Sequence, residues 1–162
     1  MRAINHKPRT LTLVLAILML SACDSRIVNH PPGSDPWMDG NPGQMLDFKS
    51  HADEGPVVML NLLKFKTSAD ENGRVGKEAY AEYIKLSSPI ANKHGATLIW
   101  SGAPTQQIIG DMDYDWDLVI LVSWPKRQNL LDLSEDPDYQ AIAHMRKAGL
   151  ERSMLIAMDE SK

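Results

Sequence analysis

The sequence predicts an α+β fold in which one four-stranded sheet is packed against helices. Four short runs of branched apolar residues, each bounded by turn residues, are typical of strands. One longer stretch repeats apolar residues at steps of four and three, and a second is bounded by capping and stopping residues, which is typical of helices. These segments follow one another as β-α-β-β-α-β, the ferredoxin-like arrangement.

A segment rich in proline and glycine precedes the first strand. Residues 24–43 carry four prolines and three glycines, so we expect residues 23–43 to form a flexible tether and residues 44–162 to form the folded domain. Trp37 and Met38 interrupt this segment. We expect them to dock on the domain, and contact with a lipid surface is the alternative. The sequence then predicts a short helix over Gln44–His51, ended by the turn at Asp53–Pro56.

The first strand and the first long helix have clear boundaries. Branched apolar residues predict a strand over Val57–Phe65, followed by a polar loop over Thr67–Gly76. Periodic apolar and aromatic residues predict a helix over Lys77–His94, ended by Gly95. We expect Pro89 to bend or restart this helix, because proline lacks the backbone N–H that the helix needs.

The second half of the domain contains the other three strands. We expect the second strand over Thr97–Ser101, resuming near Gln106–Ile109, and the third over Leu118–Trp124. A helical stretch begins near Lys126, restarts at Asp136-Pro137 and ends at Gly149, because aspartate suits a helix cap and proline suits the first turn. The fourth strand is expected over Ser153–Met158.

Two strands are apolar on both faces, and this feature bears on the oligomeric state. Leu118–Val122 and Val57–Leu60 carry no polar residue on either side of the strand. Two helical segments cover only one face of a four-stranded sheet, so the other face needs a second cover. We therefore predict a homodimer in which two sheets pack face to face.

The N-terminus resembles a bacterial lipoprotein signal peptide. Basic residues Arg2, Lys7 and Arg9 precede an apolar run over 11–20, and Leu20-Ser21-Ala22-Cys23 resembles a lipobox. The resemblance implies removal of residues 1–22, lipidation of Cys23 and anchoring to a membrane of the cell envelope, facing the periplasm or the cell exterior. Asp24 resembles a signal for retention in the inner membrane. An ordinary secretory signal followed by a free cysteine is the alternative.

The net charge and the cysteine content limit which classes of protein and which stabilising bonds are expected. Removal of residues 1–22 changes the formal net charge from −4 to −7, so we expect no nucleic-acid partner. Cys23 is the only cysteine, so the chain has no internal disulfide and its stability must come from packing. The length is that of one domain with one core.

Several motifs resemble the domain of unknown function 1330 family, over about residues 44–158. They are the run Gly55–Phe65, Tyr80-x-x-Tyr83, His94-Gly95, Ser101-Gly102, Ile109-Gly110, Trp124-Pro125, and Asp136-Pro137-Asp138-Tyr139-Gln140-Ala141 followed by Arg146. The chain differs from the family pattern at Ala96, Ser101 and Ile109. The resemblance implies a dimeric α+β barrel, a superfamily that also contains cofactor-free monooxygenases, lactone isomerases and haem-dependent peroxidase relatives.

Candidate site residues are polar groups placed among apolar ones. Asn61 shares a strand face with apolar residues, so its amide must bond to nearby backbone or to a ligand. Tyr80 and Tyr83 lie three residues apart on the helix predicted over Lys77–His94. Each phenol either packs in the core or donates to a ligand oxygen. We expect a cleft beside the sheet to be lined by these three residues together with Trp100 and Arg146. A salt bridge to an acidic side chain is the alternative role of Arg146.

Two histidines are candidate acids or bases. His94 ends the first helix, where the helix dipole alone favours it, and His144 lies in the last helix. His144 and Arg146 are two residues apart and so do not share a helix face. His51, His94 and His144 are the available axial ligands for a haem, but no motif supports one, and we expect no cofactor.

No metal site is expected. The acidic run at Asp111, Asp113, Asp115 and Asp117 resembles a calcium loop, but Trp116 replaces the turn glycine and Val122 replaces the bidentate acid. The sequence lacks the other common catalytic motifs. It leaves three hypotheses: a lipoprotein that binds a small apolar or aromatic molecule, a cofactor-independent monooxygenase or isomerase, and a non-enzymatic interaction module.

Overall fold

The computed structural model describes residues 30–110 and 115–159. Within them, four strands form one antiparallel sheet in the order β2-β3-β1-β4. The strands are β1 (Val57–Phe65), β2 (Thr97–Gly102), β3 (Leu118–Trp124) and β4 (Leu150–Met158). The helices are α1 (Pro42–Ser50), α2 (Gly76–Lys93), α3 (Arg127–Glu135) and α4 (Pro137–Gly149). The predicted ferredoxin-like α+β fold is confirmed.

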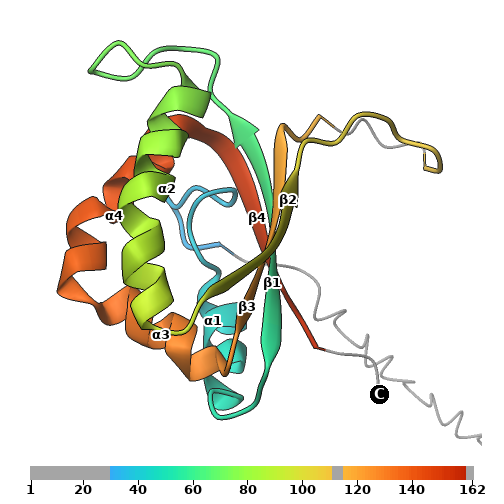
Figure 1. Ribbon diagram of the computed structural model, residues 1–162, viewed down its shortest axis with the longest axis vertical. Helices are drawn as coiled ribbons and strands as arrows, with labels where there is room; N and C mark the ends of the chain where they lie inside the picture. Colours follow the sequence, from blue (N-terminus) through green and yellow to red (C-terminus); the bar gives the residue numbers. More distant parts are fainter. Residues whose placement is uncertain (1–29, 111–114, 160–162) are drawn as a thin grey trace, which may run out of the picture.

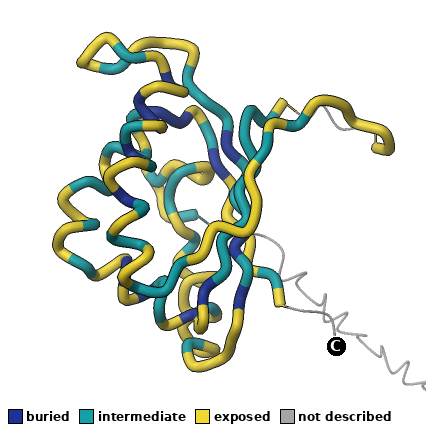
Figure 2. Tube along the Cα trace, in the orientation of Figure 1, coloured by how far each residue is buried: buried dark blue, intermediate teal, exposed yellow. Residues whose placement is uncertain are grey.

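The described helices, α1 to α4, all lie on one side of the sheet (Figure 1). The face of β1 that points toward them carries Val57, Met59 and Leu63, which are 0%, 4% and 0% exposed. The opposite face carries Val58, Leu60 and Leu62, which are only half-buried. Figure 2 shows the same contrast along the chain trace. One face of the sheet therefore holds the core and the other is open.

Helices α1 and α4 begin with side-chain caps, of which the Asp136 cap was expected. The Asn41 side chain accepts from the Gln44 N–H at 3.0 Å at the start of α1. Asp136 separates α3 from α4, and its carboxylate accepts from the backbone N–H groups of Asp138 and Tyr139. These contacts satisfy N–H groups that lack a partner within the helix.

Several elements differ from expectation. α1 begins at Pro42 rather than Gln44, so the folded domain starts inside the expected tether. α2 runs through Pro89 without a restart; the carbonyl that loses its helical donor is that of Lys85, an exposed residue, so it can bond to water. Residues 106–109 form no strand.

β4 begins at Leu150 rather than Ser153. Leu150 pairs with Phe65 after a shift in the register of the two strands, and the polar residues Glu151 and Arg152 hide this start in the sequence pattern.

The described end of the expected tether lies on the domain. The Trp37 carbonyl accepts from the Ser153 backbone N–H at 3.0 Å, and Met38 packs against the core. The prediction that Trp37 and Met38 dock is confirmed. We call residues 35–39 the strap. They belong to the folded domain rather than to a free tether, because a strand-edge N–H provides a partner for their backbone.

Candidate functional site

Five polar side chains gather between the helices and the sheet, and we call them the interior polar cluster. They are Tyr80 and Tyr83 from α2, Tyr139 and Arg146 from α4, and Ser153 from β4. Tyr80 and Tyr83 are 4% and 6% exposed, and Ser153 is 9% exposed. The two tyrosine hydroxyls of Tyr83 and Tyr139 are hydrogen-bonded at 3.0 Å. Polar groups at this depth usually have partners, so the cluster is a built feature of the interior.

Two glycines bring the helices that carry the cluster close together. An added Cβ on Gly76 would lie 2.6 Å from the Gly149 carbonyl oxygen, and one on Gly149 would lie 2.7 Å from the Tyr80 nitrogen. Only glycine permits this approach of the start of α2 to the end of α4. It places Tyr80 beside the last turn of α4, which carries Arg146.

Arg146 is half-buried and has an unusual set of partners. Its Nη2 donates to the Ser153 hydroxyl at 3.0 Å, and that hydroxyl donates to the Trp37 carbonyl at 2.9 Å. Within residues 30–110 and 115–159, no carboxylate lies at ion-pair distance from Arg146. The salt bridge considered as its alternative role is therefore not found in this part of the chain. A guanidinium without a carboxylate retains its capacity to bind an anion.

Burial keeps the two α2 tyrosines protonated. It raises the pKa of Tyr80 to about 12, against the opposing effect of the nearby Arg146 charge. Burial, together with the neighbouring Tyr139, raises the pKa of Tyr83 well above its usual value. The charged phenolate is disfavoured where water is excluded. At neutral pH both hydroxyls are therefore hydrogen-bond donors and not bases.

Asn61 lies at the middle of β1, between two apolar clusters. One cluster is centred on Val57, Met59, Trp124 and Leu133, and the other on Leu63, Tyr80, Tyr83 and Leu150. The half-buried amide donates to the carbonyl of Met59 at 3.3 Å. Asn61 pairs with Leu155 of β4, and the next helix-facing pair along the two strands is Leu63 with Ser153. Asn61 is thus a diagonal neighbour of the polar cluster across adjacent strands.

Trp100 does not join these residues. The register of β2 shifts between Leu98 and Trp100, so Trp100 pairs with Leu121 and lies on the open face. A bulge of this kind moves the following side chains to the opposite face of a sheet. The indole lies over Gly102, where an added Cβ would be 2.5 Å from the ring. The predicted cleft that included both Trp100 and Arg146 is therefore wrong in this respect.

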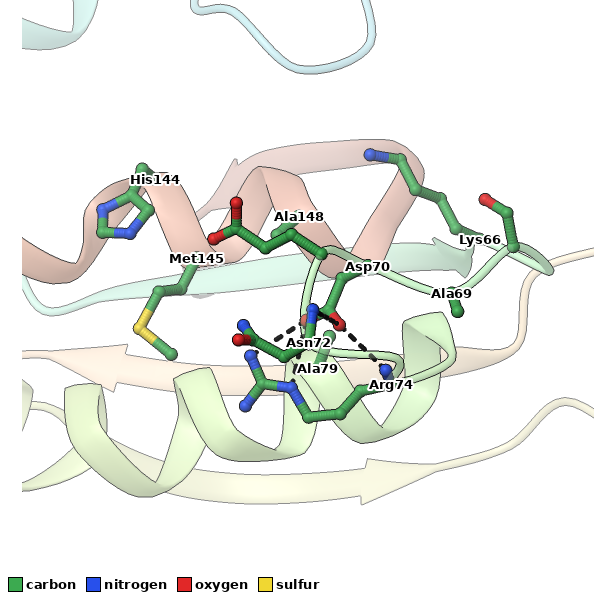
Figure 3. A pocket seen from close by; sticks show the side chains of 11 residues that line it. Lys66, Ala69, Asp70, Asn72, Arg74, Ala79, His144, Met145 and Ala148 are labelled. Atoms are coloured by element: carbon green, nitrogen blue, oxygen red, sulfur yellow. Dashed lines mark hydrogen bonds and ion pairs between the residues drawn. The ribbon is translucent and has the colours of Figure 1, made fainter.

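The two candidate histidines also lie outside the cluster. His94 Nε2 contacts Asp136 Oδ2 at 2.9 Å, joining the end of α2 to the start of α4. His144 is exposed and lines a hollow of about 590 Å³ formed with the 66–74 loop (Figure 3). The guanidinium of Arg74 in this hollow is paired with Asp70 at 2.9 Å. As expected from their spacing, His144 and Arg146 use different faces of α4.

A second hollow of about 700 Å³ lies beside β4, next to α1 and α3. Its walls include Met59 and Leu155, the strand neighbours of Asn61. Arg127 also lines it, but this guanidinium is paired with Asp159 at 2.7 Å. The hollow therefore approaches Asn61 from the sheet edge without an unpaired cation.

Sequence reasoning did not select Tyr139, Ser153 or Met38 for the site. Tyr139 stands in the motif that also led to Arg146, and this was the available signal. Ser153 and Met38 carried none, because their roles depend on contacts between residues more than a hundred positions apart.

The described residues hold no group of three or more histidine, cysteine or acidic side chains placed to bind a metal. Asp115 and Asp117 pair with Lys64. Asp111, Asp113 and the lipidation candidate Cys23 lie outside the described residues. In the described part of the chain, every helix is too short or too polar to cross a bilayer.

Comparisons with known proteins place the chain among relatives of unknown function. The family model described as "domain of unknown function (DUF1330)" matches residues 75–159. A crystal structure of a protein of unknown function from Rhodopseudomonas palustris has a TM-score of 0.72 and 30% identity, covering 78% of this chain and 98% of that chain. The methylated form of that protein has a TM-score of 0.70 and 31% identity, covering 77% and 95%. No curated protein matches this chain.

A more distant structure belongs to a dabb family protein with a ferredoxin-like fold from Mesorhizobium loti. It has a TM-score of 0.49 and 15% identity, covering 67% of this chain and 100% of that chain.

Proposed function

The chain belongs to the domain of unknown function 1330 family, and from this premise we propose that it is a lipid-anchored envelope protein that binds a small molecule at the interior polar cluster. Arg146 is the observation that carries this proposal. It lies half-buried beside two buried phenols, and no carboxylate of the described residues neutralises it. An inward-facing cation of this kind is suited to an anionic group supplied from outside the chain.

The surroundings of Arg146 favour a ligand with an apolar or aromatic body. The Phe65 and Tyr80 rings lie 5.7 Å apart, and the Tyr80 and Tyr83 rings lie 5.4 Å apart. Tilted rings at these distances pack into one apolar surface, which suits the apolar body of a ligand that gains access to it. The amide of Asn61, one strand away, provides a further polar contact.

Native mass spectrometry tests the binding proposal. The Cys23→Ser protein would be purified gently from its own host, so that a bound compound survives. We expect extra mass on this protein and its loss in the additional variant Arg146→Gln. The matched control is Arg74→Gln, because Arg74 is paired with Asp70 on the 66–74 loop. Extra mass that persists in Arg146→Gln would contradict the site, and a bare protein in every variant would contradict the function.

Cofactor-independent catalysis on an enolisable substrate is the second candidate function. The hydrogen-bonded pair of Tyr83 and Tyr139 favours it, because protonated phenols in a dry site stabilise an enolate oxygen. Turnover of such a substrate, lost in Tyr83→Phe while the fold is retained, would support catalysis over simple binding.

Homodimerisation through the open face of the sheet is part of the proposal. This face presents the side chains of Val58, Leu60, Leu62, Trp100, Val119, Leu121, Met154, Ile156 and Met158. Contiguous apolar patches of this extent are rarely left in water. A second copy fits the need, because an isologous contact matches one apolar face with the same face of another molecule.

The lipid anchor rests on the N-terminal sequence. A basic segment, an apolar run and Leu20-Ser21-Ala22-Cys23 together support lipidation of Cys23. Two or three acyl chains on one cysteine bind a membrane far more firmly than a single acyl chain does. The wild-type protein should partition into detergent and Cys23→Ser should not. Equal partitioning of the two would contradict the anchor.

A further inference from the structure

The interior polar cluster is closed in the structure. Tyr80, Tyr83 and Ser153 are each less than one-tenth exposed. A molecule that contacts them must first displace a neighbouring group. A group that lies outside the helices and strands could be displaced with the smallest loss of structure.

Met38 is such a group. The apolar cluster around Leu63, Tyr80, Tyr83 and Leu150 is completed by seven partly buried side chains, and among them Met38 alone comes from outside a helix or strand. It belongs to the strap. Removal of Met38 would expose the cluster without breaking a helix or a sheet pairing.

Ser153 connects the strap to Arg146. Its backbone N–H and its hydroxyl both donate to the Trp37 carbonyl, at 3.0 Å and 2.9 Å. The same hydroxyl accepts from Arg146 Nη2 at 3.0 Å. When the strap leaves, the Ser153 hydroxyl loses its acceptor, and it becomes a second donor beside the guanidinium.

The strap is held by contacts that are mostly at the surface. The Trp37 side chain is 45% exposed, and its ring meets the Trp116 ring at 6.4 Å. Asp39 pairs with the exposed Lys147. Exposed ion pairs contribute little to stability, so the strap can leave more easily than any element of the sheet.

We propose that residues 35–39 form a displaceable strap over the polar cluster, and that the ligand which displaces it is a small carboxylate with an apolar body. This inference rests on the function proposed above and specifies its ligand class and its control. The carboxylate would accept from Arg146 and from the freed Ser153 hydroxyl, which together match its two oxygens. The apolar body would take the place of Met38 against the tyrosine rings.

Two probes of the same shape test the ligand class. Fluorescence titration would compare 2-naphthoate with the neutral 2-naphthamide, using the full chain with Cys23→Ser. We expect 2-naphthoate to bind at least about tenfold more tightly, because a guanidinium favours a carboxylate over an uncharged amide. Equal affinities would overturn the carboxylate assignment.

Hydrogen exchange at the Ser153 amide tests the strap directly. This N–H donates to Trp37, so its protection should fall when 2-naphthoate binds. The Met154 amide, which faces β1 because N–H groups alternate along an antiparallel strand, is the internal control. Binding that leaves Ser153 protected would overturn the strap while leaving the proposed binding function intact.

A strap variant gives the independent measurement. Met38→Ser should weaken the strap, and it should tighten 2-naphthoate binding about tenfold if the strap covers the site about nine-tenths of the time. Met45→Ser on α1 is the matched control and should leave the affinity unchanged. No gain in Met38→Ser, in a protein whose melting temperature shows that it is folded, would overturn the strap. If neither probe binds any variant, the ligand class is overturned, and the native mass spectrum then decides the binding function separately.

Discussion

The two faces of the sheet have similar residues and different surroundings. On β1, Leu63 faces the helices and is fully buried, whereas its neighbour Leu62 faces the other way and is half-buried. The same alternation runs through β3, where Ile120 packs in the core and Leu121 lies on the open face. The described helices lie on one face only, and none of them covers the other. The apolar residues of a strand therefore indicate which of its faces are covered in the assembled protein, and not only which faces are covered by its own chain.

The largest expected effect comes from truncating a side chain on the covered face of the sheet. Leu63→Ala should lower the free energy of unfolding by about 2–5 kcal/mol, because it removes a fully buried side chain and leaves a cavity. Leu62→Ala is the matched variant on the open face. Its effect should be smaller and should depend on protein concentration, since dimer formation stabilises the folded state by mass action. Chemical denaturation at two protein concentrations measures both. Equal, concentration-independent losses would remove the distinction between the faces.

A charge on the open face should disrupt the dimer without unfolding the domain. Leu121→Asp should weaken dimerisation by about a hundredfold or more, because a carboxylate would be buried without a partner. Analytical ultracentrifugation measures the shift, and circular dichroism checks the fold. Lys85→Asp, on the exposed surface of α2, is the control. A wild-type protein that is already monomeric at micromolar concentration would contradict the dimer itself.

Residues 103–110, which follow β2 and which we call the arm, should have a smaller effect on the same equilibrium. Ile108 and Ile109 in the arm are 78% and 92% exposed, and the arm projects to the open-face side of the sheet (Figure 1). Ile109→Ser should weaken the dimer by less than about tenfold, since the loss is that of one apolar side chain. An unchanged dissociation constant would show that the arm does not take part in the interface.

The smallest expected effect lies on the covered side and depends on pH. The hydrogen bond with His94, together with the backbone N–H groups of Asp138 and Tyr139, lowers the pKa of Asp136 below its usual value of 3.8. The stability from this charge is therefore fully present above that value and is lost as the pH falls through the lower folded-state pKa. Asp136→Asn retains a capping side chain without the charge. Its melting temperature should fall below that of the wild type at pH 6 and should approach it near pH 2. A constant difference across this range would contradict the assignment.

The elements of the fold could be predicted because their signals are local. A few consecutive residues are enough to show which faces of a strand are apolar and which face of a helix is buried, as in Val57–Phe65 and around Tyr80. Capping and stopping residues such as Asp136 and Gly95 act on their immediate neighbours. For the same reason, the sequence predicted where Tyr80, Tyr83 and Arg146 stand on their helices.

Contacts between distant segments could not be predicted in this way. The register shift in β2 moved Trp100 to the open face, and no local pattern marks it. The strap provides a second example, because its contacts with the core and with the Ser153 N–H join residues more than a hundred positions apart.

By itself, the sequence determined the order of strands and helices, the apolar character of both sheet faces and the positions of the tyrosines and arginine on their helices. These features follow from side-chain periodicity, which needs no more than the adjacent turns of chain. Within the described residues, tertiary structure alone decided that Arg146 meets a serine and not a carboxylate, that Trp100 lies apart from Arg146, and that residues 35–39 dock beside Ser153. The reason is that each of these outcomes depends on strand register and on packing between residues far apart in the chain.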